Sequence, residues 1–182
     1  MQRLGALTIS LLFAATGALA GCDSGGGSGG STPPTAPSPA IIVTPDGGGS
    51  PPRFGIRSGS GSTSDLLQLE IFAAEIVQVQ AIDFNLTVPN TLLRLDNFER
   101  GELIGAGAQV ILQNGGSSAP SFEILRTAPS GATGSGIVLT LTFAAIGAGN
   151  GRFDFIDPVA EDPLGLEIPN VDWIGAAVQV IR

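Results

Sequence analysis

The chain has 182 residues, 43% of them hydrophobic, and carries 16 acidic residues against eight basic ones, for a formal net charge of −8. It contains no histidine, tyrosine or lysine and a single cysteine. This composition excludes histidine acid–base catalysis, metal ligation by histidine or paired cysteines, and an intramolecular disulfide. The excess negative charge also argues against a nucleic-acid partner, because phosphate backbones are repelled.

The N-terminus has the order of features expected of an export signal. Met1–Arg3 is short and positively charged, residues 4–19 are apolar or small, and Leu19-Ala20-Gly21 leads into Cys22. The apolar run is shorter than the ~20 residues that a membrane-spanning helix requires. The arrangement resembles the lipobox of bacterial lipoproteins, which predicts a signal peptide over residues 1–21 and lipidation of Cys22. An ordinary secretory signal with an unrelated cysteine and an uncleaved anchor are the alternatives.

Lipidation of Cys22 implies that the mature protein is exported and anchored to a bacterial membrane of the cell envelope. Two or more acyl chains anchor a protein stably, because each buried CH₂ contributes ~0.8 kcal/mol. Asp23 resembles an inner-membrane retention signal of enteric bacteria, but the sequence leaves open which membrane and which leaflet hold the protein.

The segment that follows, residues 22–63, is predicted to be a disordered tether. Its last 41 residues include 11 glycines, 8 serines and 7 prolines, too few apolar groups to offset the chain entropy lost on folding. Two short apolar runs interrupt it. Residues 40–43 are expected to remain linker, and residues 54–56 are equally consistent with linker and with a first edge strand.

Residues 64–182 are predicted to form one all-β domain. Apolar residues alternate with polar ones, which is typical of half-buried strands, and clusters of glycine and proline separate these segments. Many short strands of this kind favour a β-sandwich. The phase of the alternation changes between Val79 and Ile82, which predicts a turn or bulge near Gln80–Ala81. The predicted inward sets are Leu67, Leu69 and Ile71; Ile82, Phe84, Leu86 and Val88; Ile137, Leu139, Leu141 and Phe143; Phe153 and Phe155; and Val178 and Val180.

Several motifs occur in an order and spacing that resemble a family. They are the strand and proline turn at 81–93, the glycine-led turn at 101–104, the Gly-Ser-Gly entry to a strand at 134–144, Asp157-Pro158, the Gly-x-x-Ile-Pro step at 165–169 and the terminal strand at 177–180. Over residues 65–182 this order is similar to that of a cohesin domain. The resemblance implies a jelly-roll β-sandwich of about nine strands, related to some carbohydrate-binding modules.

Cohesins bind dockerins, which are small calcium-loaded helical modules, so the resemblance implies a protein partner. Asp83 stands where dockerin-binding cohesins carry an aspartate that faces the partner, and Asn85 and Thr87 follow on the same outward phase. The sequence departs from the family pattern at Ala81, where an asparagine is common, and at Val88, where a tyrosine is usual. The alternative for Asp83 is a solvated strand residue.

Two further sets of residues are candidate sites. Trp173 is the one candidate for stacking on a sugar ring, and packing against the domain is its alternative. Asp154, Asp157 and Asp162, with Glu161 nearby, suggest a loop calcium site or a glycosidase pair, against the alternative of solvated turns. No cofactor is expected.

Three classes of function remain. The first is a membrane-tethered, non-enzymatic binding module of cohesin type that recruits a dockerin-like protein. The second is a polysaccharide-binding lipoprotein that uses the same sandwich. The third is a structural envelope protein without a separate ligand. An enzyme is disfavoured, because neither a nucleophile–base motif nor a phosphate-binding loop is present.

Overall fold

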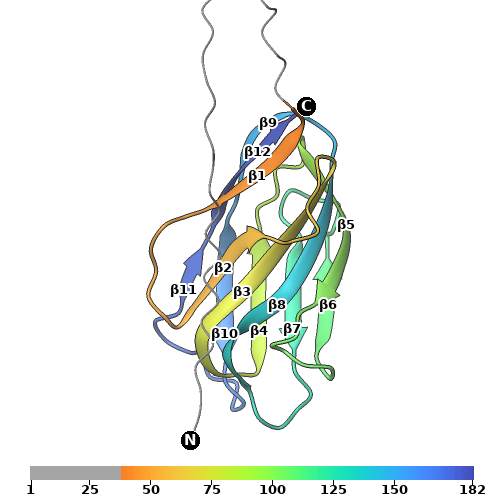
Figure 1. Cartoon of the computed structure of the whole chain (residues 1–182). Helices are drawn as coiled ribbons and strands as arrows, with labels where there is room; N and C mark the ends of the chain where they lie inside the picture. The colour runs from red at the N-terminus through yellow and green to blue at the C-terminus, as the bar shows by residue number, and fades with distance from the viewer. Residues whose placement is uncertain (1–37) are drawn as a thin grey trace, which may run out of the picture. The chain divides into compact units, whose positions relative to one another are not determined.

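The computed structural model describes residues 38–182, which form twelve strands and no helix (Figure 1). These residues belong to one compact unit. No helix within them is long and apolar enough to cross a membrane. The predicted signal peptide, Cys22 and the first part of the predicted tether lie outside the described residues.

The strands assemble into three sheets, and every neighbouring pair is antiparallel except β11–β2. The four-stranded sheet has the order β10 (Phe155–Glu161), β4 (Ala81–Leu86), β7 (Ser121–Leu125) and β6 (Gln109–Gln113). The five-stranded sheet has the order β11 (Asp172–Ile174), β2 (Arg53–Ser58), β3 (Leu66–Val79), β8 (Ala132–Ala145) and β5 (Leu93–Arg100). The three-stranded sheet has the order β1 (Ala40–Pro45), β12 (Ala176–Ile181) and β9 (Gly149–Phe153).

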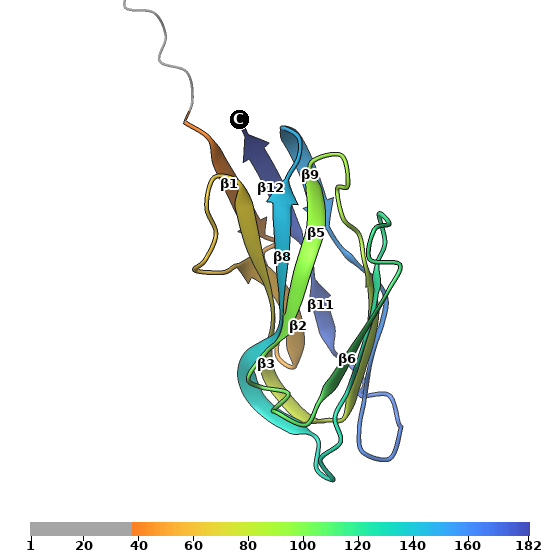
Figure 2. The same cartoon turned by 90° about the vertical axis from the view of Figure 1, so that its right-hand side faces the viewer.

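The sheets form layers that face each other, as the edge-on view in Figure 2 shows. One cluster of buried apolar side chains lies between them. Most side chains expected to point inward are buried in this core, because alternate residues of a strand point to the same face, but Ile137 and Phe155 are only half-buried. The largest of the fully buried side chains are Phe54, Phe84, Phe122, Phe143 and Phe153. The all-β prediction and the sandwich prediction are therefore confirmed.

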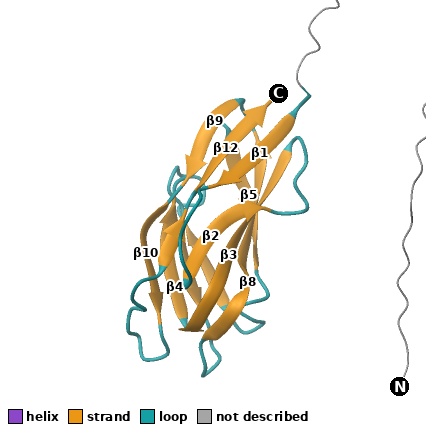
Figure 3. Ribbon diagram, turned by 60° about the vertical axis from the view of Figure 1, so that its left-hand side comes forward, coloured by secondary structure: helices purple, strands orange, loops and turns teal. Residues whose placement is uncertain are grey.

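Two of the twelve strands directly continue others, so the chain makes ten extended segments, close to the expected nine or so. β9 and β10 are separated only by Asp154, and β11 and β12 only by Gly175. At both points the chain leaves one sheet and enters another (Figure 3). These two points of the chain lie in close contact. A Cβ atom added to Gly175 would be 2.6 Å from both Asp154 Oδ1 and the Phe153 carbonyl oxygen. Only glycine allows this approach.

The first two strands correct the predicted domain boundary. All six residues of β1 pair with β12, and β2 pairs with β3 from Arg53 to Ser58. Phe54 and Ile56 are fully buried. The folded domain therefore begins before residue 64. The prediction that residues 40–43 remain linker is wrong, and residues 54–56, which were equally consistent with linker and strand, lie in β2. The composition argument failed because two short apolar runs gain backbone partners and core contacts that only the folded sandwich provides.

The end of β1 is held by a cluster of charges. Arg152 donates hydrogen bonds to Asp154 on its own chain segment and, at 2.6 Å, to Asp46 Oδ2 just after β1. The hydrogen bonds to Asp154 and Asp46, together with their charges, raise the pKa of the Arg152 guanidinium above its ordinary value. This contact joins the N-terminal strand to the point where β9 gives way to β10.

The long pair β3–β8 contains bulges that the alternation did not reveal. Glu75 and Gln78 have positive φ, and their amides donate to hydroxyl oxygens of β8 rather than to its carbonyls. As a result Val77 is 62% exposed, whereas Ile76 is buried. In β8 a register shift buries Val138 completely and leaves Ile137 half-buried. The predicted break near Gln80–Ala81 is confirmed, since β3 ends at Val79 and β4 begins at Ala81.

Candidate functional site

The outward side of the four-stranded sheet, here called the four-stranded face, is the surface that carries the predicted partner-binding residues. The strand register defines three rows across it. The first row is Glu161, Ala81, Leu125 and Gln109; the second is Val159, Asp83, Glu123 and Ile111; the third is Ile156, Asn85, Ser121 and Gln113. Because neighbouring strands lie about 4.8 Å apart, the members of a row can contact one ligand together.

A shallow hollow of about 400 Å³ lies where β10, β4 and β7 meet. A bulge in β10 between Ile156 and Val159 opens it, and Asp157 sits in that bulge with a φ of 47°. Four carboxylates border the hollow, and alanine, isoleucine and valine side chains complete its lining. The lining residues are Ala81, Ile82, Asp83, Glu123, Asp157, Val159 and Glu161.

The charges on this face are unbalanced. Strands β4, β6, β7 and β10 contain no arginine, and none of the four carboxylates around the hollow forms a salt bridge with a described residue. Large apolar side chains stand exposed among them, namely Ile111, Leu125 and Ile156, at 42%, 41% and 39%. The face is therefore both acidic and partly apolar.

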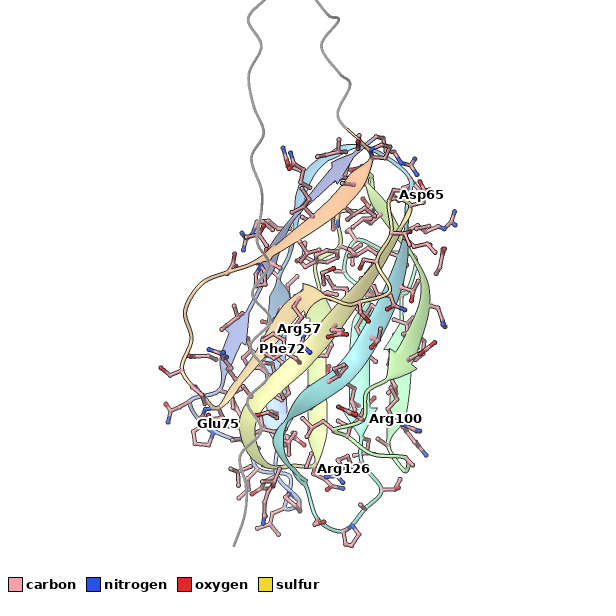
Figure 4. All side chains as sticks on the ribbon, in the orientation of Figure 1. Arg57, Asp65, Phe72, Glu75, Arg100 and Arg126 are labelled. Atoms are coloured by element: carbon pink, nitrogen blue, oxygen red, sulfur yellow. The ribbon has the colours of Figure 1, made fainter. Side chains whose placement is uncertain are left out.

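The outward side of the five-stranded sheet differs, because two of its arginines are paired with carboxylates within the domain. Arg57 donates to Glu70 at 2.8 Å and lies over the ring of Phe72, 5.1 Å from its centroid (Figure 4). Arg94 donates to Asp96 at 2.9 Å, and this contact raises the pKa of the Arg94 guanidinium. These pairs leave less unbalanced charge for a partner than the four-stranded face does.

The structure places the three predicted partner-binding residues on or beside the four-stranded face. Asp83 is exposed at its centre, between Val159 and Glu123. Asn85 is half-buried one row away. Thr87 follows the end of β4, and its amide donates to the carbonyl of Asp154. Asp83 and Asn85 thus share the face, and Thr87 stands at its margin.

Sequence reasoning missed the neighbours of Asp83. Glu123, Asp157 and Glu161 surround the same hollow, yet they come from two strands that lie far from β4 in the sequence. The exposed side chains of Ile111 and Ile156 were also missed. The alternation of polar and apolar residues around Glu123 is a signal that could have placed it outward, but only the strand order brings Glu123 and Ile111 beside Asp83.

The prediction that Trp173 provides a platform for sugar is not supported by its position. Trp173 stacks on Phe54 with ring centroids 4.4 Å apart and meets Phe155 edge to face at 5.1 Å. Trp173 lies in β11, the edge strand of the five-stranded sheet, and its half-buried ring packs toward β10, the edge strand of the four-stranded sheet. Its role is therefore packing against the domain, the alternative that the sequence left open.

The predicted calcium ligands are not gathered into a site. Asp154 binds Arg152, and Asp162 accepts the amides of Leu164 and Leu166 at 2.8 and 3.0 Å, which closes a tight turn. Asp157 points into the hollow with Asp83 and Glu123. Within residues 38–182 no three acidic side chains stand close enough together to hold a metal ion.

Comparison with known proteins identifies the fold. No family model matches the chain, and no curated protein matches it by sequence. A non-cellulosomal cohesin from Archaeoglobus fulgidus has a TM-score of 0.54 at 14% identity and covers 74% of this chain and 88% of its own. A type II cohesin domain from the cellulosome of Acetivibrio cellulolyticus has a TM-score of 0.58 at 12% identity, with 75% and 94% covered.

A third solved structure, from the same bacterium, is a type II cohesin–X-dockerin complex with an N-terminal interface mutation. Its TM-score is 0.54 at 12% identity, and the match covers 74% of this chain and 98% of that one. Structural similarity at 12–14% sequence identity establishes the fold, and the chain has a cohesin-like β-sandwich.

Proposed function

We propose that the protein is a non-enzymatic binding module that recruits a partner protein through the four-stranded face and is held at a membrane by lipid on Cys22. The observation that carries the binding function is the group of unpaired carboxylates around Asp83, set among exposed isoleucine and leucine side chains. The partner would be a dockerin-like module. Support for this partner comes from the fold, since one solved structure with this fold is a complex with a dockerin-containing partner.

The chemistry of the face indicates what the partner offers. Exposed Ile111, Leu125 and Ile156 favour a partner with an apolar stripe, because their burial contributes roughly 25 cal/mol per Å². The carboxylates favour arginine or lysine beside that stripe, since an unpaired charge on either side of the interface is costly to bury. An amphipathic helix with basic flanks fits both requirements.

The ends of the domain are consistent with a tethered role. Ala40 lies opposite Ile181, so the chain enters the domain at the pole where it also ends (Figure 1). The hollow lies toward the other pole, because Ala81 and Glu161 are neighbours where β3 passes into β4. A domain attached through its N-terminal segment would therefore present the hollow away from its point of attachment.

The structure gives no support to the polysaccharide alternative, because the aromatic side chain on which it rested is packed against Phe54 and Phe155. The non-enzymatic assignment rests on the fold, whose solved relatives are cohesins, and on the absence of histidine from the chain.

A binding assay with purified dockerin modules tests the partner. The full chain is immobilised and titrated with each module in the presence of calcium. Asp83→Arg should abolish binding. Glu99→Arg is the matched control, because Glu99 is exposed on β5 in the other large sheet and its reversal adds the same charge elsewhere. Equal binding by the two variants would exclude the four-stranded face.

The membrane proposal is tested separately. The chain is expressed in a bacterium with labelled palmitate, and Cys22→Ser is compared with the unchanged sequence. Label should enter the membrane-bound protein only when Cys22 is present. Label-free protein recovered in the soluble fraction from both chains would contradict the anchor without affecting the binding proposal.

A further inference from the structure

Arg126, the residue that follows β7, differs from the other arginines of residues 38–182. Figure 4 shows it at the end of the domain opposite Asp65. Its Nε and Nη1 atoms are buried and have no hydrogen-bond partner. Six other arginines in this range donate side-chain hydrogen bonds: Arg53 to Gly48 and Gly49, Arg57 to Glu70, Arg94 to Asp96, Arg100 to Ala108, Arg152 to Asp46 and Asp154, and Arg182 to Ala145.

Arg126 is half-buried, and leaving two of its guanidinium nitrogens buried without a partner is costly. Arginine keeps its proton at any physiological pH, so burial cannot be relieved by neutralising the group. Buried charges in proteins are normally paired, and buried N–H donors are normally bonded. No carboxylate among the described residues lies within salt-bridge distance of Arg126. Its positive charge therefore lacks a counter-charge from the folded domain.

The guanidinium borders a small cavity beneath the loop that joins β5 to β6. The cavity has a volume of about 110 Å³ and is lined by residues 104–108 and 126–128. That volume exceeds the space needed by a single water, which is on the order of 10–15 Å³ on the same measure. It leaves room for a small ion of several heavy atoms.

The walls of the cavity are fixed on both sides. Thr127 donates its hydroxyl to the Gly107 carbonyl at 2.7 Å, and Arg100 donates to the Ala108 carbonyl at 2.9 Å. The side-chain amide of Gln80 anchors the other side through the Arg126 and Ala128 carbonyls. The Nη2 atom of Arg126 faces the loop, and a Cβ built on Gly105 would meet it at 3.9 Å.

From this arrangement we infer that Arg126 and the 104–108 loop form a binding site for a small oxyanion, either a tetrahedral ion or a carboxylate. The guanidinium would donate to an oxygen of such a group through Nη2, the nitrogen nearest Gly105 of the loop. The anion supplies the negative charge that the domain lacks at this point. Waters in the cavity would satisfy the donors but would leave the charge unbalanced. This site is independent of the four-stranded face.

Titration of the full chain with sulfate, phosphate and acetate, each against chloride at constant ionic strength, tests the site. The measurement is the side-chain Nε–Hε resonance of each arginine by NMR. The Arg126 resonance should shift and saturate with at least one of the three ions. The Arg57 resonance should not, because its Nε already donates to Glu70. Sulfate or phosphate alone would identify a tetrahedral site, and acetate alone a carboxylate site.

Thermal unfolding of variants provides the second measurement. The effective ion should raise the Tm of the unchanged chain by a few degrees at saturation, because a ligand that binds only the folded state stabilises it. Arg126→Gln should lose this rise, and Arg57→Gln, the matched control, should keep it. If Arg126→Gln does not fold, the resonance of the unchanged chain decides by itself. A shift of Arg126 that stays linear in ion concentration, or that Arg57 shares, would overturn the inference.

Discussion

Trp173 stacks on Phe54 with ring centroids 4.4 Å apart and ring planes 17° from parallel. The two residues come from neighbouring parallel strands, β11 and β2, at paired positions. By sequence alone, Phe54 is equally consistent with linker and with an edge strand, and Trp173 with a sugar site and with packing. Their contact shows that both close the same side of the core.

Trp173→Ala should therefore lower the free energy of unfolding by about 2–4 kcal/mol, below the upper range for fully buried tryptophans because the ring is partly exposed. Chemical denaturation measures the change. Trp173→Phe should recover part of the loss, since it keeps an aromatic ring beside Phe54. Leu164→Ala is the control, because Leu164 is 82% exposed. A Trp173→Ala variant with an unchanged free energy of unfolding would contradict the packing role.

Removal of β1 should destabilise the domain. A chain that begins at residue 47 loses one of the two strands that pair with β12 and the core contacts of Ile41 and Val43. The expected cost is about 2–4 kcal/mol from apolar burial and ladder hydrogen bonds, and the uncovered edge of β12 should promote aggregation. A chain that begins at residue 38 is the control. Equal unfolding midpoints and solubility for the two chains would show that β1 is dispensable.

Gly101 should not tolerate a side chain. It is buried, its amide donates to the Val138 carbonyl at 2.8 Å, and a Cβ would overlap the backbone of Ile137. Gly101→Ala is expected to cost at least about 2 kcal/mol, since backbone rather than a flexible side chain must move. Gly116→Ala, where a Cβ meets nothing within 4 Å, should change stability little. Thermal unfolding of the two variants compares them, and similar midpoints would refute the overlap.

Association through the four-stranded face should weaken as salt rises. The carboxylates of Asp83 and Glu123 are not paired with described residues, so their attraction for a basic partner is screened over roughly 8–10 Å at physiological ionic strength. The association rate should fall several-fold between low and high salt. Kinetic binding measurements at several salt concentrations give the slope. Replacing Asp83 with Asn and Glu123 with Gln should reduce the dependence of the association rate on salt. An unchanged dependence would show that other charges attract the partner.

Calcium by itself should leave the Tm of the chain unchanged. Asp154 and Asp162 are engaged by Arg152 and by backbone amides, and no group of three carboxylates within residues 38–182 is close enough to form a site. Calorimetry with calcium and with magnesium as a control checks this. A saturable rise specific to calcium would show that the loops rearrange to bind it.

The alternation of apolar residues was sufficient to predict the sandwich and most of its core, as the buried Phe84, Leu141 and Phe143 illustrate. Local pattern also located the break between β3 and β4. It could not locate the bulges at Glu75 and Gln78, because these depend on hydroxyl groups of Ser135 and Thr133 that come from another strand.

By itself, the sequence determined the fold class, the lack of histidine chemistry and the outward phase of Asp83, since each depends only on composition or on the two-residue period of a strand. The tertiary structure alone decided that residues 40–58 belong to the domain, that Trp173 packs inside it, and that Glu123 and Asp157 surround Asp83. The physical reason is that strand order joins residues remote in sequence. A short apolar run or a lone charge acquires its role only from the neighbours that this order supplies.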